Sequence, residues 1–146
     1  MVKRLSVRIY KEPAIKINRI AFRTNKLVYV ARANKKWRYQ WGRSRIVYIG
    51  TTRKGAKRMA SSAAWKGEDL LFRYGVKHLE FNVVACGKVS GLDSWRKLER
   101  ALLIRFREEY GSVPLGNSVG KSTHWKVERE YFSTKVLNKI IDTLGR

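Results

Sequence analysis

The chain has 146 residues, of which 44% are hydrophobic, so it is long and apolar enough to fold as one domain around a core. Its 33 Lys and Arg against 11 Asp and Glu give a formal net charge of +22, which predicts a polyanionic partner, DNA or RNA. No apolar stretch suits a membrane span or a secretory signal, so we expect no membrane partner. A single cysteine excludes an internal disulfide, and with two histidines it cannot build a zinc cage. We therefore expect a cytoplasmic protein in a reducing compartment, in which any metal is held by oxygen atoms.

Alternating apolar and polar residues predict strands in the N-terminal half of the chain. Extra N-terminal strands are expected over residues 5–10 and 15–22, with a bend near residues 18–19. Further strands are expected over 27–31 and 46–49. Between these two, Trp37, Tyr39 and Trp41 alternate with polar residues, which predicts that the two strands form one long hairpin.

The second half of the chain is dominated by helical patterns. We expect a helix over 54–65, a short helix over 68–74 and a strand over 78–85. A long helix over 92–110 should end at Gly111, and a polar loop should cover 118–127. A C-terminal helix should begin near Ser133 and end at Gly145. These elements predict an α+β fold, a small and mostly antiparallel sheet flanked by helices, in a single domain over residues 1–146.

The most unusual position on the long helix is Glu99, which interrupts an apolar stripe. An unpaired buried carboxylate is costly, so Glu99 must be protonated, paired with a cation or bound to a metal ion. A buried ion pair and a divalent-metal site facing a phosphate are both open. The stripe consists of Trp95, Leu98, Leu102, Leu103, Phe106 and Tyr110.

A glycine turn joins the strand at 46–49 to the following helix. Gly50 lets the backbone bend, and Thr51 or Thr52 can cap the helix. This turn places Tyr48 at the end of the strand and Arg58 about two turns into the helix.

Ten residues are candidates for binding nucleic acid. Aromatic rings can stack on bases while neighbouring basic side chains bind phosphates, although packing of the aromatic rings over the sheet is an equal alternative. The ten candidates are Lys35, Lys36, Trp37, Arg38, Trp41, Arg43, Arg45, Arg53, Lys54 and Lys57.

Several of these features together resemble the GIY-YIG nuclease superfamily. Tyr29 follows Val28 on one strand, and Tyr48 stands in a Val-Tyr-Ile-Gly run on the next. Arg58 lies ten residues after the second tyrosine, as in the family. Glu99 on a later helix and Asn117 in a Pro-Leu-Gly-Asn turn complete the pattern. The resemblance covers residues 27–117, and leaves 1–26 and 118–146 as extensions for substrate grip or dimer contacts.

The chain departs from the family pattern in three ways. Leu27 replaces the glycine of the first motif. The interval between Tyr29 and Tyr48 is longer than the usual short hairpin. Ser62 stands where members often carry His or Tyr one turn after the arginine, so proton transfer is the step that the resemblance supports least.

The resemblance implies a metal-dependent endonuclease that hydrolyses DNA by a one-metal mechanism, of a free-standing restriction-like or mobile-element type. Glu99 would hold Mg²⁺ or Mn²⁺, and Arg58 would contact the scissile phosphate. Tyr29 or Tyr48 would accept a proton from the attacking water or orient it. A base role requires a lowered phenol pKa, which a nearby metal and many cations would favour. Asn117 would brace the glutamate loop by hydrogen bonds.

Two other functions are open. One is a non-catalytic nucleic-acid-binding protein on the same scaffold, such as a component of a ribosome or another RNA–protein particle; the net charge of +22, Leu27 and Ser62 favour it. The other is a structure-selective repair nuclease. We expect DNA rather than RNA as the partner, and a palindromic target would require a homodimer.

Overall fold

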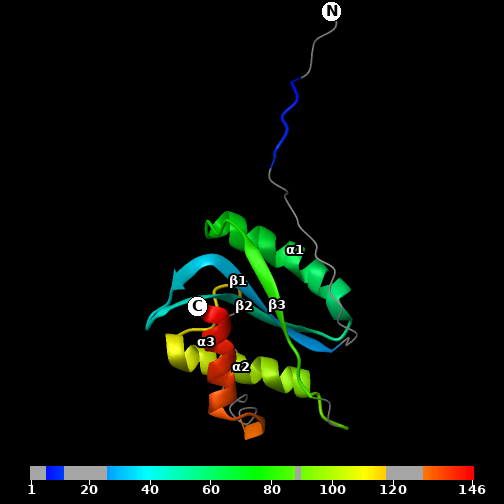
Figure 1. Cartoon of the computed structure of the whole chain (residues 1–146), viewed down its shortest axis with the longest axis vertical. Coiled ribbons are helices and arrows are strands. Elements are labelled where there is room, and N and C mark those ends of the chain that lie inside the picture. Colours follow the sequence, from blue (N-terminus) through cyan, green and yellow to red (C-terminus); the bar gives the residue numbers. More distant parts are fainter. Residues whose placement is uncertain (1–5, 12–25, 88–89, 118–129) are drawn as a thin grey trace, which may run out of the picture.

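The computed structural model describes residues 6–11, 26–87, 90–117 and 130–146, and in this part of the chain one antiparallel sheet lies between helices (Figure 1). The sheet has the order β2-β1-β3, with α1 on one face and α2 and α3 on the other. The predicted α+β fold with a C-terminal helix is therefore confirmed. The elements are β1 (Leu27–Arg38), β2 (Arg43–Thr52), α1 (Gly55–Arg73), β3 (Leu79–Val84), α2 (Ser94–Tyr110) and α3 (Thr134–Gly145).

The central strand β1 is buried on both faces because helices cover both sides of the sheet. Leu27 and Tyr29 point toward α1, where they pack around Met59. Val28 and Val30 point the other way, into the core formed with α2 and α3. This alternation follows from the two-residue period of a strand. It places Tyr29 on the α1 face, which matters for the site below.

β1 and β2 form the predicted long hairpin, and their register pairs Tyr29 with Gly50 and Ala31 with Tyr48. Both strands are longer than predicted because the segment rich in tryptophan continues them up to a tight turn. At that turn the amide of Tyr39 donates a hydrogen bond to the carbonyl of Gly42 at 2.8 Å. Irregular pairing near Arg32 bends the hairpin.

The helices predicted over 54–65 and 68–74 are one continuous helix, α1, so the predicted break is wrong. Gly67 lies inside the helix, and the burial of Met59 and Leu70 against the sheet offsets its low helix propensity. Because α1 begins at Gly55, Arg58 lies in its first turn and not two turns into it. The prediction that Thr51 or Thr52 caps the helix is wrong, because the N-cap residue is Lys54 and no side chain caps α1. Thr52 instead accepts a hydrogen bond from the amide of Lys54 at 3.0 Å, in the turn before the helix.

The predicted ends of the other two helices are confirmed. α2 ends at Gly111, whose φ of 86° is the left-handed conformation that favours glycine. Ser133 caps α3, because its side chain accepts a hydrogen bond from the amide of Val136 at 3.2 Å.

The strand predicted over residues 5–10 is wrong where the structure describes that segment. Residues 6–11 are not in a strand, and Val7 and Ile9 are 86% and 84% exposed. Alternation can specify an apolar face, but a strand also needs a neighbouring strand to pair with. The strand predicted over 15–22 and the loop predicted over 118–127 lie outside the described residues.

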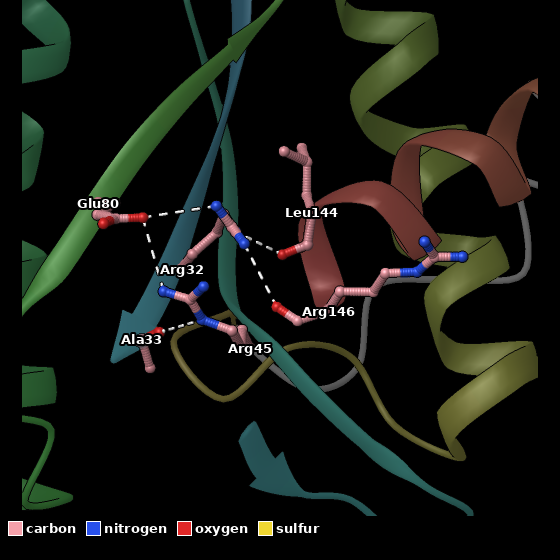
Figure 2. A network of polar contacts seen from close by, with 6 residues as sticks. All are labelled: Arg32, Ala33, Arg45, Glu80, Leu144 and Arg146. Atoms are coloured by element: carbon pink, nitrogen blue, oxygen red, sulfur yellow. Dashed lines mark hydrogen bonds and ion pairs between the residues drawn. The ribbon is translucent and has the colours of Figure 1, made fainter. Parts of the chain in front are cut away.

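α3 is fastened to the sheet at its C-terminal end by Arg32 of β1 (Figure 2). The Nε of Arg32 donates to the carbonyl of Leu144 at 2.6 Å, and a second nitrogen donates to the carbonyl of Arg146 at 3.3 Å. A cation at a helix C-terminus is favourable because unpaired carbonyls gather there. Glu80 of β3 lies 3.5 Å from Arg32 and 3.6 Å from Arg45, so it balances both guanidinium groups.

Candidate functional site

Two of the predicted site residues, Tyr29 and Tyr48, meet over Gly50. Their ring centroids are 5.9 Å apart on the α1 face of the sheet. A Cβ atom at Gly50 would lie 2.7 Å from both Cζ and the phenol oxygen of Tyr29, and 2.8 Å from Cε1 of Tyr48. Real side chains do not approach this closely, so glycine is needed here to make room for the paired phenols. The presence of glycine at the end of the Val-Tyr-Ile-Gly run therefore has a direct steric explanation.

Glu99 approaches the same end of β2 from helix α2. Its carboxylate oxygen Oε2 accepts a long hydrogen bond of 3.5 Å from the hydroxyl of Thr51, the residue after Gly50. The carboxylate is also close enough to act electrostatically on the Tyr48 phenol. Glu99 is half-buried and its flanking apolar residues are buried, as the stripe predicted. The structure thus brings Glu99 to the two tyrosines.

The side chain of Asn117 forms two hydrogen bonds with the outer edge of β2, an edge strand of the sheet. Its side-chain oxygen accepts a hydrogen bond from the amide of Ile49 at 3.0 Å, and its side-chain nitrogen donates to the carbonyl of Ile49 at 2.8 Å. The amide of Gly116 donates to the carbonyl of Val47 at 2.7 Å. Asn117 therefore braces β2 itself, which corrects the expectation that it braces the glutamate loop.

Sequence reasoning missed Lys66 on α1. Its ammonium nitrogen donates to the carbonyl of Gly116 at 3.0 Å and lies 4.9 Å from the centre of the Tyr48 ring. It therefore ties the loop that holds β2 to α1, directly above a candidate site residue. No spacing in the sequence signals this role, because its partner lies 50 residues away.

Arg58 lies at the border of this cluster. It is exposed in the first turn of α1, and the next residue, Met59, is buried against Tyr29. The structure therefore gathers four of the five predicted catalytic residues and leaves Arg58 beside them.

The start of α1 is strongly basic. Its first turn holds no acidic residue, and the amide groups of a helix N-terminus already attract anions. Cations at this end are unfavourable for the helix unless an anion is bound nearby. The exposed basic residues here are Arg53, Lys54, Lys57 and Arg58.

The Tyr48 phenol has a raised pKa, not the lowered one that a base role requires. Burial is the largest cause, and the neighbouring Tyr29 and then the Glu99 carboxylate act in the same direction. A buried phenolate beside a carboxylate is unfavourable, so Tyr48 stays protonated near neutral pH. In this environment the phenol is suited to donate a hydrogen bond.

Most of the nucleic-acid-binding candidates are on the surface, but two have packing roles instead. Trp37 is partly buried, with its ring edge-on to Tyr74 at 5.8 Å. Arg45 donates a hydrogen bond to the carbonyl of Ala33 at 2.8 Å and is paired with Glu80 (Figure 2). The exposed candidates are Lys35, Lys36, Arg38, Trp41, Arg43, Arg53, Lys54 and Lys57.

The described residues contain no cluster of three or more His, Cys, Asp or Glu side chains able to hold a metal ion. Glu99 is the carboxylate of the tyrosine cluster, with the hydroxyl of Thr51 beside it. Among the helices of the described part, none is long and apolar enough to cross a membrane.

Comparisons of the chain with protein-family models, with curated proteins and with solved structures find no match. The resemblance to GIY-YIG nucleases therefore rests on the residues of this chain alone.

Proposed function

We propose that the protein is a metal-dependent endonuclease that hydrolyses phosphodiester bonds in DNA, of a free-standing restriction-like or mobile-element type. The observation that carries this proposal is the meeting of Tyr29, Tyr48 and Glu99 at the end of β2 around Gly50. These residues are far apart in the sequence, yet the fold gathers the same ones that make the chain resemble GIY-YIG nucleases. The net charge of +22 suits a polyanionic substrate.

The donor atoms around Glu99 fit a single magnesium or manganese ion. Mg²⁺ prefers oxygen ligands and is commonly held by one or two carboxylates together with water and substrate phosphate. The carboxylate of Glu99 and the nearby hydroxyl of Thr51 are oxygen donors of this kind. When bound, such an ion supplies stabilisation of charge on the phosphoryl oxygens and lowers the pKa of a bound water.

The basic start of α1 is suited to hold the phosphate that is cut. Arg58 presents a planar fork of N–H groups that matches two phosphate oxygens. Its side chain is exposed and has no described partner, so it is available for an anion. The exposed Lys54 and Lys57 would bind the neighbouring phosphates.

The paired phenols have a positioning role in this proposal. Because burial keeps Tyr48 protonated, it donates a hydrogen bond to the attacking water or to a phosphate oxygen. Tyr29 holds the Tyr48 ring in place from the other side of Gly50. The proton of the water then leaves to another acceptor, such as solvent or a phosphate oxygen.

The experiment compares wild-type protein with Glu99→Gln on supercoiled plasmid, linear duplex and RNA of the same sequence, with Mg²⁺, Mn²⁺ or EDTA. Wild type should cut DNA with either metal, and Glu99→Gln should lose about 100-fold or more in rate, because several kcal/mol of charge stabilisation disappear. Glu108→Gln is the matched control, since it removes an exposed carboxylate from the same helix. Equal rates for wild type and Glu99→Gln under every condition would refute the catalytic proposal.

A second candidate is a non-catalytic nucleic-acid-binding protein, such as a component of an RNA–protein particle. One observation favours it: burial raises the pKa of the Tyr48 phenol, whereas a base role requires a lowered value. It predicts that the purified protein retains RNA and shows no metal-dependent cleavage. A structure-selective repair nuclease predicts instead that flap or branched DNA is cut faster than plain duplex.

A further inference from the structure

The turn between β1 and β2 is held rigidly at the C-terminal end of α2. The amide of Trp41 donates to the carbonyl of Tyr110 at 3.2 Å, and the amide of Tyr39 donates to the carbonyl of Gly42 at 2.8 Å. Tyr39 is buried, and its phenol donates to the carbonyl of Ile46 at 2.7 Å. A Cβ atom at Gly42 would lie 3.1 Å from the Tyr110 ring, so the turn is in close contact with α2.

On this fixed backbone the indole of Trp41 is 64% exposed. The other two aromatic residues of the segment point into the molecule, Trp37 against Tyr74 and Tyr39 against Phe106. A rigid backbone carrying one large exposed aromatic ring costs little entropy when the ring is covered by a partner. The Trp41 ring is therefore pre-organised to stack against a flat apolar group of a partner.

The charge around Trp41 indicates which partner covers it. Arg38 and Arg43 pair across the hairpin on either side of the turn, and both are exposed. Lys35 and Lys36 are exposed farther along β1. The sequence has no Asp or Glu between residues 13 and 67. An apolar protein surface would leave these cations unpaired, whereas a nucleic acid carries phosphates that pair with the cations and flat bases that stack on the ring.

We propose that Trp41 stacks on an unpaired base of the nucleic acid, with Arg38 and Arg43 on the flanking phosphates. In a duplex the base faces are covered by their neighbours, so an indole face selects a base outside the stack. This inference rests on the proposed function in taking a nucleic acid as the ligand. It adds that the preferred ligand has a single-stranded segment.

The turn is separate from the tyrosine cluster. Gly50 comes seven residues after Arg43 along β2, a span of about 23 Å at ~3.3 Å per residue. Substitution of Trp41 therefore leaves Tyr48 and Glu99 in place, and it tests binding without touching the proposed chemistry.

The test measures binding of labelled oligothymidine and of a duplex by fluorescence anisotropy in EDTA, so that no cutting interferes. Trp41→Ala should weaken single-strand binding by about tenfold or more and leave duplex affinity unchanged, while Trp41→Phe should retain most of the affinity because the smaller ring still stacks. Trp65→Ala is the matched control, because Trp65 is 77% exposed on α1 and should contribute nothing.

Two outcomes would overturn the inference: no effect of Trp41→Ala on the single strand, or an equal loss on single strand and duplex, which would make Trp41 a general contact. The outcome is independent of cleavage. If Trp41→Ala loses single-strand binding selectively and wild type cuts nothing, the stacking role stands and the nuclease proposal is refuted. If wild type cuts DNA efficiently and Trp41→Ala binds the single strand as well as wild type does, the nuclease proposal stands and the stacking role is refuted.

Discussion

Replacing Gly50 with alanine tests whether the two phenols share the space that the structure gives them. The new methyl group would lie 2.7 Å from Cζ and the phenol oxygen of Tyr29, about an ångström closer than carbon atoms normally approach. Tyr29 is 2% exposed and packs between Tyr48 and Phe81, so its ring has little room to move away. The strain must therefore appear in the free energy of unfolding.

Overpacking of this kind typically costs 1–3 kcal/mol, so we expect Gly50→Ala to destabilise the protein by about 2 kcal/mol. For a chain of this size, that lowers Tm by roughly 4–8 °C. Urea unfolding followed by circular dichroism gives the free energy directly, and a constant m-value would show that the unfolded state has not changed.

Gly87→Ala is the matched control, because a Cβ atom there meets nothing within 4 Å. In a double-mutant cycle, Tyr29→Leu should remove most of the penalty of Gly50→Ala, since the shorter side chain leaves space for the methyl group. If Gly50→Ala costs no more than Gly87→Ala, or if the two substitutions are additive, the steric explanation of the motif glycine is refuted.

Three further predictions concern stability. Asn117→Ala should cost about 1–3 kcal/mol in urea unfolding because it leaves both the amide and the carbonyl of Ile49 without their side-chain partner, and a negligible loss would contradict the bracing role. Burial raises the pKa of Tyr48 in the folded protein, so the stability that this residue contributes should be full below the ordinary tyrosine pKa of about 10 and should fall as the pH rises above it. In urea unfolding at a series of pH values, Tyr48→Phe should lose less stability at alkaline pH than wild type does. An equal loss in both proteins would contradict the role of Tyr48. Arg32→Ala should lower hydrogen-exchange protection in the last turn of α3 while protection in α1 stays unchanged, and equal loss in both helices would show that the contact in Figure 2 is not local.

Local signals predicted the fold well where one segment carries all the information. Gly111 and Ser133 mark helix ends because capping depends on a few neighbouring residues. The break expected before residue 68 failed because packing of Leu70 on the sheet, which lies outside the local sequence, sustains the helix through Gly67. Residues 6–11 failed for the converse reason, since their alternation finds no neighbouring strand in the described part.

The sequence predicted which residues come together in the candidate site better than it predicted their ionisation and contacts. The order of the motifs pointed to Tyr29, Tyr48 and Glu99, and the structure brings them together. Burial raises the pKa of the Tyr48 phenol, and burial depth is not visible in a motif. The lowered pKa expected beside a bound metal ion stays a prediction. Lys66 was missed because its contact with Gly116 exists only once α1 and the loop after α2 have folded against each other.

The loop at residues 114–117 also has a consequence for solubility. The run Ile46 to Ile49 is apolar and rich in β-forming residues, the composition of segments that recruit strands from other molecules when an edge is open. Gly116 and Asn117 occupy the carbonyl of Val47 and both polar backbone groups of Ile49, so an incoming strand has nothing to bond to there. A chain in which this loop detaches should therefore aggregate before it unfolds completely, and the same asparagine that steadies a candidate site acts as a guard against self-assembly.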